Sequence, residues 1–120
     1  MLSSLLSGTE MGQKHNINRD QITLMRAGDL ADPSKFRPSD AGSDLSPKSV
    51  EDLKKWKLSE SEQSGLKSDI EANGVQEPVQ LGRFNRGHSD AYDLLLAGHH
   101  RVYSAEAVDP DMMVPVKWRH

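Results

Sequence analysis

The chain has 120 residues, of which 35% are apolar and 28% charged, and its formal net charge is −3. This length fits one domain and excludes a second independent one, and the acidic balance excludes tight polyanion binding by the chain as a whole while allowing a local basic cleft. The absence of cysteine excludes disulfides, thiolate metal sites and thiol catalysis. No apolar run approaches the roughly 18 residues of a membrane span, so we expect a cytoplasmic protein without membrane association.

The first 20 residues are rich in Ser, Gly, Asn and Gln and show no sustained periodicity, which predicts a flexible N-terminal arm before a domain at 21–120. Gln21–Met25 has β-like composition and predicts the first strand. Residues 31–47 are dense in Pro, Asp, Ser and Gly and predict a long loop. Long loops inside compact domains are often functional, although an ordinary surface connection fits equally well.

Two helices are predicted next. Ser46 followed by Pro47 is typical of a helix start, and Val50, Leu53 and Trp56 recur at about one turn, which predicts a short amphipathic helix. Ser59 and Glu62 have capping-box spacing and predict a second start, with Gly74 as the C-terminal cap.

The remaining chain alternates strand and helix signals. Pro78–Phe84 and Ala91–Ala97 predict a hairpin joined by a polar, Gly-containing turn. The segment 99–107 has helical composition, "DPD" ends it, and 113–118 predicts a last strand. The order β, α, α, β, β, α, β predicts an α+β fold in which a small mixed sheet packs with about three helices.

The stretch "GHHR" (98–101) joins a buried strand to a helix. Gly98 allows a tight turn and close approach of a ligand. The first amides of the helix, its dipole and the Arg101 guanidinium together favour an anion, and His99 and His100 add donors. The pattern therefore predicts a phosphate site. A metal pair is disfavoured because helix neighbours point about 100° apart, whereas a plain turn covered by solvated histidines stays open as an alternative.

The hairpin brings a carboxylate to the same turn. If Phe84 lies opposite Ala91, Glu77 lies opposite Gly98, within a residue or two. Gln76 and Glu77 are then expected beside the anion, where Glu77 could hold Mg²⁺ or act as a general base. An exposed residue before a strand proline is the alternative for Glu77.

Four segments resemble the ParB/sulfiredoxin superfamily. "GHHRVYSA" is similar to its phosphate-binding box, "DPSKFRP" to a proline- and arginine-containing box, "GLKSDIEANGVQEPVQL" to its helix, glycine and strand segment, and "MMVPVKW" to its closing strand. The resemblance covers roughly 21–118 in the same order. It implies the ParB/sulfiredoxin-like fold, a nucleoside triphosphate (CTP or ATP) with Mg²⁺, and a second phosphate or base contact from Arg37.

The departures narrow the functions that the resemblance implies. His99 stands where sulfiredoxin has its catalytic cysteine, which excludes that activity. We expect no sequence-specific centromere binding by this chain, because the family's helix-turn-helix and dimerisation domains have no counterpart in 21–120. The His-His box resembles those of free-serine kinases and of small ParB-like proteins of phages and mobile elements that are labelled nucleases.

Three functions follow. The first is a DNA-associated ParB-like domain that acts as a nuclease or nucleotide-dependent switch, with Glu77, His99 and His100 as candidate catalytic residues and Gly98, Arg101, Gln76 and Arg37 as further ligand contacts. The second is a small-molecule phosphotransferase, and the third a non-catalytic interaction domain. DNA would occupy a basic cleft of Arg37, Arg83, Arg86 and Arg101, and a homodimer is a further possible partner arrangement.

Overall fold

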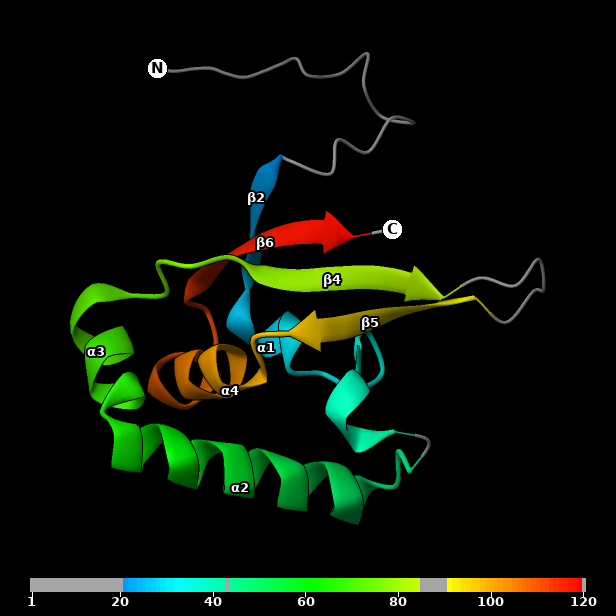
Figure 1. The fold of residues 1–120 in the computed structure, drawn as a ribbon, viewed down its shortest axis with the longest axis horizontal. Helices are drawn as coiled ribbons and strands as arrows, with labels where there is room; N and C mark the ends of the chain where they lie inside the picture. The colour runs from blue at the N-terminus through cyan, green and yellow to red at the C-terminus, as the bar shows by residue number, and fades with distance from the viewer. Residues whose placement is uncertain (1–20, 43, 85–90, 120) are drawn as a thin grey trace.

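The computed structural model describes residues 21–42, 44–84 and 91–119 (Figure 1). The predicted arm at 1–20, the hairpin turn at 85–90 and Arg86 lie outside these residues. The described elements are, in chain order, β2 (Ile22–Arg26), α1 (Ala27–Leu30), β3 (Arg37–Pro38), the 3-10 turn η2 (Ser39–Ala41), α2 (Pro47–Ser64), α3 (Leu66–Asn73), β4 (Val79–Phe84), β5 (Tyr92–Ala97), α4 (His99–Val108) and β6 (Met113–Arg119).

The strands form one five-stranded sheet in the order β2-β6-β4-β5-β3. β2 pairs antiparallel with β6 and β4 antiparallel with β5, whereas β4 and β6, and β3 and β5, run parallel. This confirms the predicted α+β class with a mixed sheet. The three predicted helices correspond to α2, α3 and α4, and a fourth of one turn, α1, was not predicted.

The core lies between the sheet and the helices. Along β4 and β6, Val79, Leu81, Val114 and Val116 are fully buried, and their neighbours other than the buried Gly82 are more exposed, the pattern of strands with one covered face. These side chains pack in one cluster with residues of α1, α3 and α4, among them Leu30, Ile70, Val102 and Tyr103. The helices therefore cover one face of the sheet.

Two details of the predicted helices are wrong. The helix that begins at Pro47 does not end before Ser59; α2 continues to Ser64, and Gly65, at a left-handed φ of 84°, separates it from α3. Trp56 is also not on the buried side, since it is 59% exposed. The buried positions are Val50, Leu53, Lys57 and Ser61. Residues with this spacing form one face of the helix, and Trp56 lies outside that face.

The predicted loop at 31–47 contains more structure than expected. Arg37 and Pro38 form β3, a short parallel edge beside Leu94 and Leu95 of β5, and η2 follows at once. The hydroxyl of Ser39 donates to the carbonyl of Leu96 at 3.1 Å, which ties η2 to the same strand. The segment is therefore held along the sheet edge, and Asp40 is brought to the helical side.

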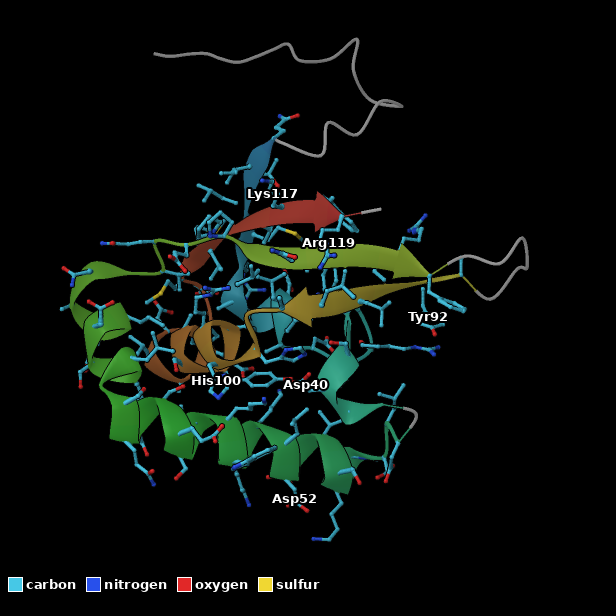
Figure 2. The ribbon with its side chains drawn as sticks, in the orientation of Figure 1. Asp40, Asp52, Tyr92, His100, Lys117 and Arg119 are labelled. Carbon is cyan, nitrogen blue, oxygen red and sulfur yellow. The ribbon has the colours of Figure 1, made fainter. Side chains whose placement is uncertain are left out.

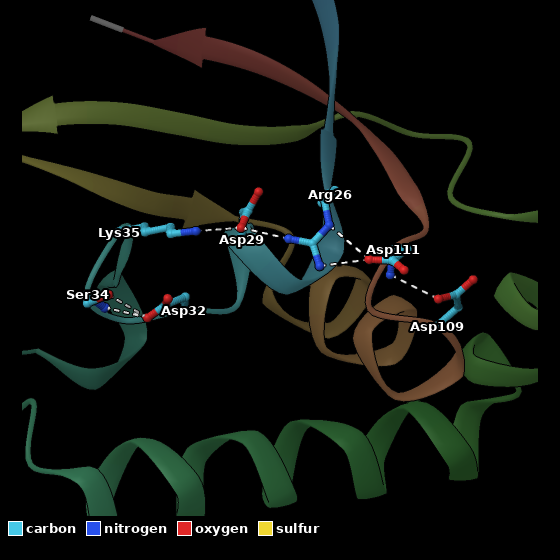
Figure 3. Close-up of polar contacts among 7 residues, drawn as sticks. All are labelled: Arg26, Asp29, Asp32, Ser34, Lys35, Asp109 and Asp111. Atoms are coloured by element: carbon cyan, nitrogen blue, oxygen red, sulfur yellow. Dashed lines mark hydrogen bonds and ion pairs between the residues drawn. The ribbon is translucent and has the colours of Figure 1, made fainter.

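A polar cluster fixes the junction between β2, α1 and the start of β6 (Figure 3). The Arg26 guanidinium donates to Asp111 at 3.0 and 2.8 Å and to Asp29 at 2.9 Å, and Lys35 pairs with the same oxygen of Asp29 at 2.6 Å. Asp111 is anchored in turn by its own amide, which donates to Asp109. These contacts join segments that are 85 residues apart in the sequence.

Among the described residues, no helix has the length and apolar character needed to cross a membrane.

Candidate functional site

The site is built on the turn at Gly98. This residue caps α4 at a φ of 100°, and a Cβ atom there would lie 2.6 Å from Cγ1 of the buried Val79. Only glycine fits both conditions. The first helical hydrogen bond runs from the amide of Val102 to the carbonyl of Gly98 at 2.9 Å. The amides of residues 99–101 precede it, where a helix leaves its N–H groups without intrahelical partners, and no described side chain caps this end.

A pocket of about 750 Å³ opens beside this turn. Its volume lies within the range of small-molecule sites. Gly98, His100 and Arg101 form one side, Leu66, Ile70 and Val75 form an apolar wall, and Gln76 and Glu77 lie at the start of β4; Glu60, Ser64, Asp69 and Gly74 complete the lining. The walls contributed by α2 and α3, and Glu60 and Asp69 in particular, were missed in the sequence because no motif marks them.

Arg101 and Glu77 are in contact, as the predicted hairpin required. The Nη1 group of Arg101 donates to Oε1 of Glu77 at 3.0 Å, and Nη2 donates to the carbonyl of Pro78 at 3.4 Å. The pairing places Phe84 opposite Tyr92 rather than Ala91, and a register shift follows between Gln80 and Leu81. The predicted register was therefore wrong by one residue at Phe84 and by two at Gln80, which pairs with Ala97, and Glu77 reaches the turn as expected within a residue or two.

The ion pair leaves Arg101 accessible to a ligand. The side chain of Glu77 is 83% exposed, whereas that of Arg101 is 24% exposed. The Nε group of Arg101 is buried and has no hydrogen-bond partner among the described residues. An exposed carboxylate contributes little to holding its partner, so a phosphate oxygen could replace Glu77.

His100 faces the pocket and meets a carboxylate. Its Nε2 atom lies 2.7 Å from Oε1 of Glu60, which comes from the last turns of α2. A carboxylate in this position orients the imidazole ring. The pair was not predicted, because Glu60 belongs to the segment that was interpreted as a new helix start.

His99 does not line the pocket, which corrects its assignment as a phosphate donor. It is 4% exposed, with Nδ1 3.6 Å from Oδ2 of Asp40 and Nε2 buried without a described partner. Lys57 donates to the same Asp40 oxygen at 2.7 Å. Burial lowers the pKa of His99, opposed by the charge of Asp40, and the Lys57 hydrogen bond lowers the pKa of Asp40. His99 is thus a neutral core residue.

The buried His99 predicts a pH dependence of stability. Its lowered pKa means that the unfolded chain, whose histidines titrate near pH 6.5, binds this proton more readily than the folded protein. The free energy of unfolding is therefore expected to fall as the pH drops below about 6.5, with a slope of at most about 1.4 kcal/mol per pH unit from this one proton. Asp40, whose pKa is also lowered, acts in the same direction only below about pH 4.

Denaturant titrations of the wild type and His99→Gln at pH 7.5, 6.5 and 5.5 test this expectation. The variant removes the titrating ring, so the loss of stability between the first and last of these pH values should shrink. Equal pH dependence of the two proteins would contradict it.

The other residues predicted to contact a ligand lie in different parts of the structure. Gln76 lines the pocket. Arg37 does not; its guanidinium lies 3.7 Å above the ring of Tyr92, and Arg83 pairs with Asp93 at 2.8 Å. Arg37 pairs with Leu94 and Arg83 pairs with Asp93. Because Asp93 and Leu94 are consecutive in one strand, the two arginines lie on opposite faces of the sheet. Arg37, Arg83 and Arg101 therefore do not line one cleft.

No three His, Asp or Glu side chains converge as a metal site within the described residues. His99 and His100 contact different carboxylates, Asp40 and Glu60, and cannot chelate one ion together. A single carboxylate such as Glu77 still suits Mg²⁺ that arrives with phosphate oxygens, because that ion keeps most of its shell as water and phosphate.

Comparisons with known proteins return no match: no family model, no curated protein and no solved structure is significantly similar to the chain.

Proposed function

We propose that this chain is a small ParB/sulfiredoxin-like domain that binds a nucleotide, or another phosphate-bearing ligand, at the turn between β5 and α4, in a DNA-associated role as a nuclease or nucleotide-dependent switch. The observation that carries the binding proposal is the uncapped N-terminus of α4 at the edge of a pocket that also holds Arg101. Free helix amides and a guanidinium are complementary to a phosphate group.

The rest of the pocket suits the organic part of such a ligand. Leu66, Ile70 and Val75 offer an apolar wall against which a flat ring could pack. Glu60 and Asp69 offer acceptor oxygens for hydroxyl or amino groups. The proposal thus places the phosphate on the α4 side of the pocket and the organic part of the ligand against the wall formed by α2 and α3.

The charge of the lining predicts a need for a divalent cation. Glu60, Asp69 and Glu77 outnumber the one permanent cation, Arg101. A bare triphosphate would meet repulsion from these carboxylates, and Mg²⁺ would neutralise part of its charge. Glu77 is the residue best placed to contact that ion, because it is exposed at the pocket edge and adjoins Arg101.

Thermal unfolding with a panel of nucleotides, each with and without Mg²⁺, tests the proposal. A ligand present at about 100 times its Kd should stabilise the fold by roughly 2.7 kcal/mol. We expect a rise in Tm with at least one nucleotide, larger when Mg²⁺ is present. Mg²⁺ alone and inorganic phosphate are the controls. No shift with any phosphate ligand would contradict the proposal.

A phosphotransferase is the second candidate, favoured by the contact between His100 and Glu60. An imidazole held by a carboxylate in a ligand pocket can accept the proton of an attacking hydroxyl. His100→Gln should then abolish transfer while leaving nucleotide binding, measured by the same thermal shift, nearly unchanged. Retained transfer in this variant would remove His100 as the base.

A further inference from the structure

The sheet has a second face, away from the helices, which we call the open face. Cross-strand partners point to the same side, so the register assigns to it Ile22, Leu24, Arg26, Met113, Pro115, Lys117, Arg119, Gln80, Gly82, Phe84, Tyr92, Leu94 and Arg37. The buried partners Val79, Leu81, Leu95, Val114 and Val116 lie on the other side. Figure 2 shows Lys117 and Arg119 on β6, away from Asp40, His100 and the helices.

The charged strand residues of the open face are all cations, and none of the strand residues that the register places there is Asp or Glu. Arg26 is already paired with Asp29 and Asp111, which leaves Lys117, Arg119 and Arg37. Asp93 of β5 lies on the other face with Arg83. A chain with a net charge of −3 has thus separated its charges, with carboxylates around the pocket and cations on the sheet.

Two of these cations are held in place. Arg119 donates to Oε1 of Gln80 at 3.0 Å. Arg37 is an exposed residue whose guanidinium carbon lies 3.7 Å from the centre of the Tyr92 ring, and the Tyr92 ring stacks in turn on that of Phe84, with the ring centres 5.0 Å apart. A guanidinium fixed on an aromatic ring can contact a phosphate through its edge or a base through its outer plane.

Apolar side chains lie next to the cations. Ile22 is 53% and Leu24 60% exposed, and their partners across the strand pair are Lys117 and Pro115. A ligand that covers this face must therefore offer flat or apolar groups and negative charges at close spacing. Bases and phosphates of an unpaired strand provide both.

Other occupants fit less well. A second copy docked by a twofold axis would set the same cations near one another without a carboxylate to pair them. Duplex DNA presents phosphates but keeps its bases stacked inside, which leaves Ile22 and Leu24 unused. An anionic membrane would accommodate the apolar side chains. Arg37, however, is held on Tyr92 at the opposite edge of the sheet from β2, and this placement suits an extended nucleic-acid strand that crosses the whole face.

We infer that the open face binds single-stranded nucleic acid, with Lys117, Arg119 and Arg37 contacting phosphates and with bases lying over the apolar side chains of β2 and β6. The surface is separate from the pocket, so the inference stands whether or not the pocket binds a nucleotide.

Fluorescence anisotropy with a labelled single-stranded oligonucleotide of about 16 nucleotides tests it. Three phosphate contacts predict that log affinity falls with log salt with a slope of about −2, since each contributes about −0.7. Lys117→Gln with Arg119→Gln should reduce the slope to about −0.7. Lys48→Gln with Lys55→Gln is the matched control, because it removes the same charge from exposed residues of α2.

A melting curve establishes that each variant is folded, and Arg37→Ala, away from β6, is a second probe that should also weaken binding. Absence of binding at low salt would overturn the inference. Equal losses in the two double variants would also overturn it, as would a preference for the duplex, or sedimentation with anionic vesicles in place of oligonucleotide binding.

Discussion

Replacement of Gly98 by alanine is expected to destabilise the protein by about 3–5 kcal/mol, because two costs coincide at one atom. The backbone φ of 100° is a conformation that side chains disfavour, and the new Cβ would lie 2.6 Å from Cγ1 and 2.8 Å from Cβ of Val79. Val79 is fully buried and cannot move aside freely. Since the whole domain is stable by only about 5–15 kcal/mol, Gly98→Ala should lose a large part of this stability and unfold at a markedly lower temperature.

Two controls separate the costs. Gly65 has a similar φ of 84°, but nothing lies within 4 Å of its Cβ position, so Gly65→Ala should cost only about 1–2 kcal/mol. Val79→Ala removes Cγ1 but keeps the Cβ atom 2.8 Å away, so Gly98→Ala should cost less, but still cost stability, when it is made in Val79→Ala instead of in the wild type. Denaturant titrations measure the wild type and all four variants. Similar free energies of unfolding for the two glycine variants would show that the contact with Val79 does not matter.

Substitution of Arg101 by lysine is expected to lower nucleotide affinity roughly tenfold to a hundredfold, as for a charged hydrogen bond of about 1.5–3 kcal/mol. The planar guanidinium can hold two phosphate oxygens, whereas an ammonium group acts as a point charge. Stability should change little, because the present partner, Glu77, is 83% exposed and such a pair contributes only about 0–1 kcal/mol.

Isothermal titration and a melting curve of Arg101→Lys together discriminate the two roles of this residue. A lower Tm with unchanged affinity would mean that Arg101 only pairs with Glu77, and would remove the main reason for the site. Glu77→Gln refines the result: without Mg²⁺ it should raise affinity by freeing Arg101, and with Mg²⁺ it should lower affinity if Glu77 holds the ion.

The sequence predicted the centre of the site because its chemistry is local. Gly98, the start of α4 and Arg101 are consecutive, and the hairpin that returns Glu77 to them is set by two adjacent strands. The turn at Gly98 and the pairing of the two strands can each be predicted from residues that are close together in the sequence. The predicted register was wrong by one residue at Phe84 and by two at Gln80, because no signal in the sequence marks the register shift between Gln80 and Leu81.

The walls of the site could not be predicted in the same way. Whether His99 or His100 faces the pocket depends on how α4 is rotated against α2, and the sequence places both residues beside Gly98. Likewise, Ser59 and Glu62 match a capping box, but the Val50, Leu53, Lys57 and Ser61 stripe keeps α2 continuous through them. Tertiary packing outweighed the local signal in each case.

The pocket is shared between two parts of the chain that can change independently. Gly98, His100 and Arg101 form the side to which the proposed function assigns the anion, while residues 60–77, from the end of α2 through α3 to the start of β4, supply nearly all of the opposite wall. Gly65 separates the two helical pieces of that wall at a left-handed turn. Proteins built on this plan could therefore exchange one ligand for another by altering a single short segment, while keeping the turn at Gly98 unchanged.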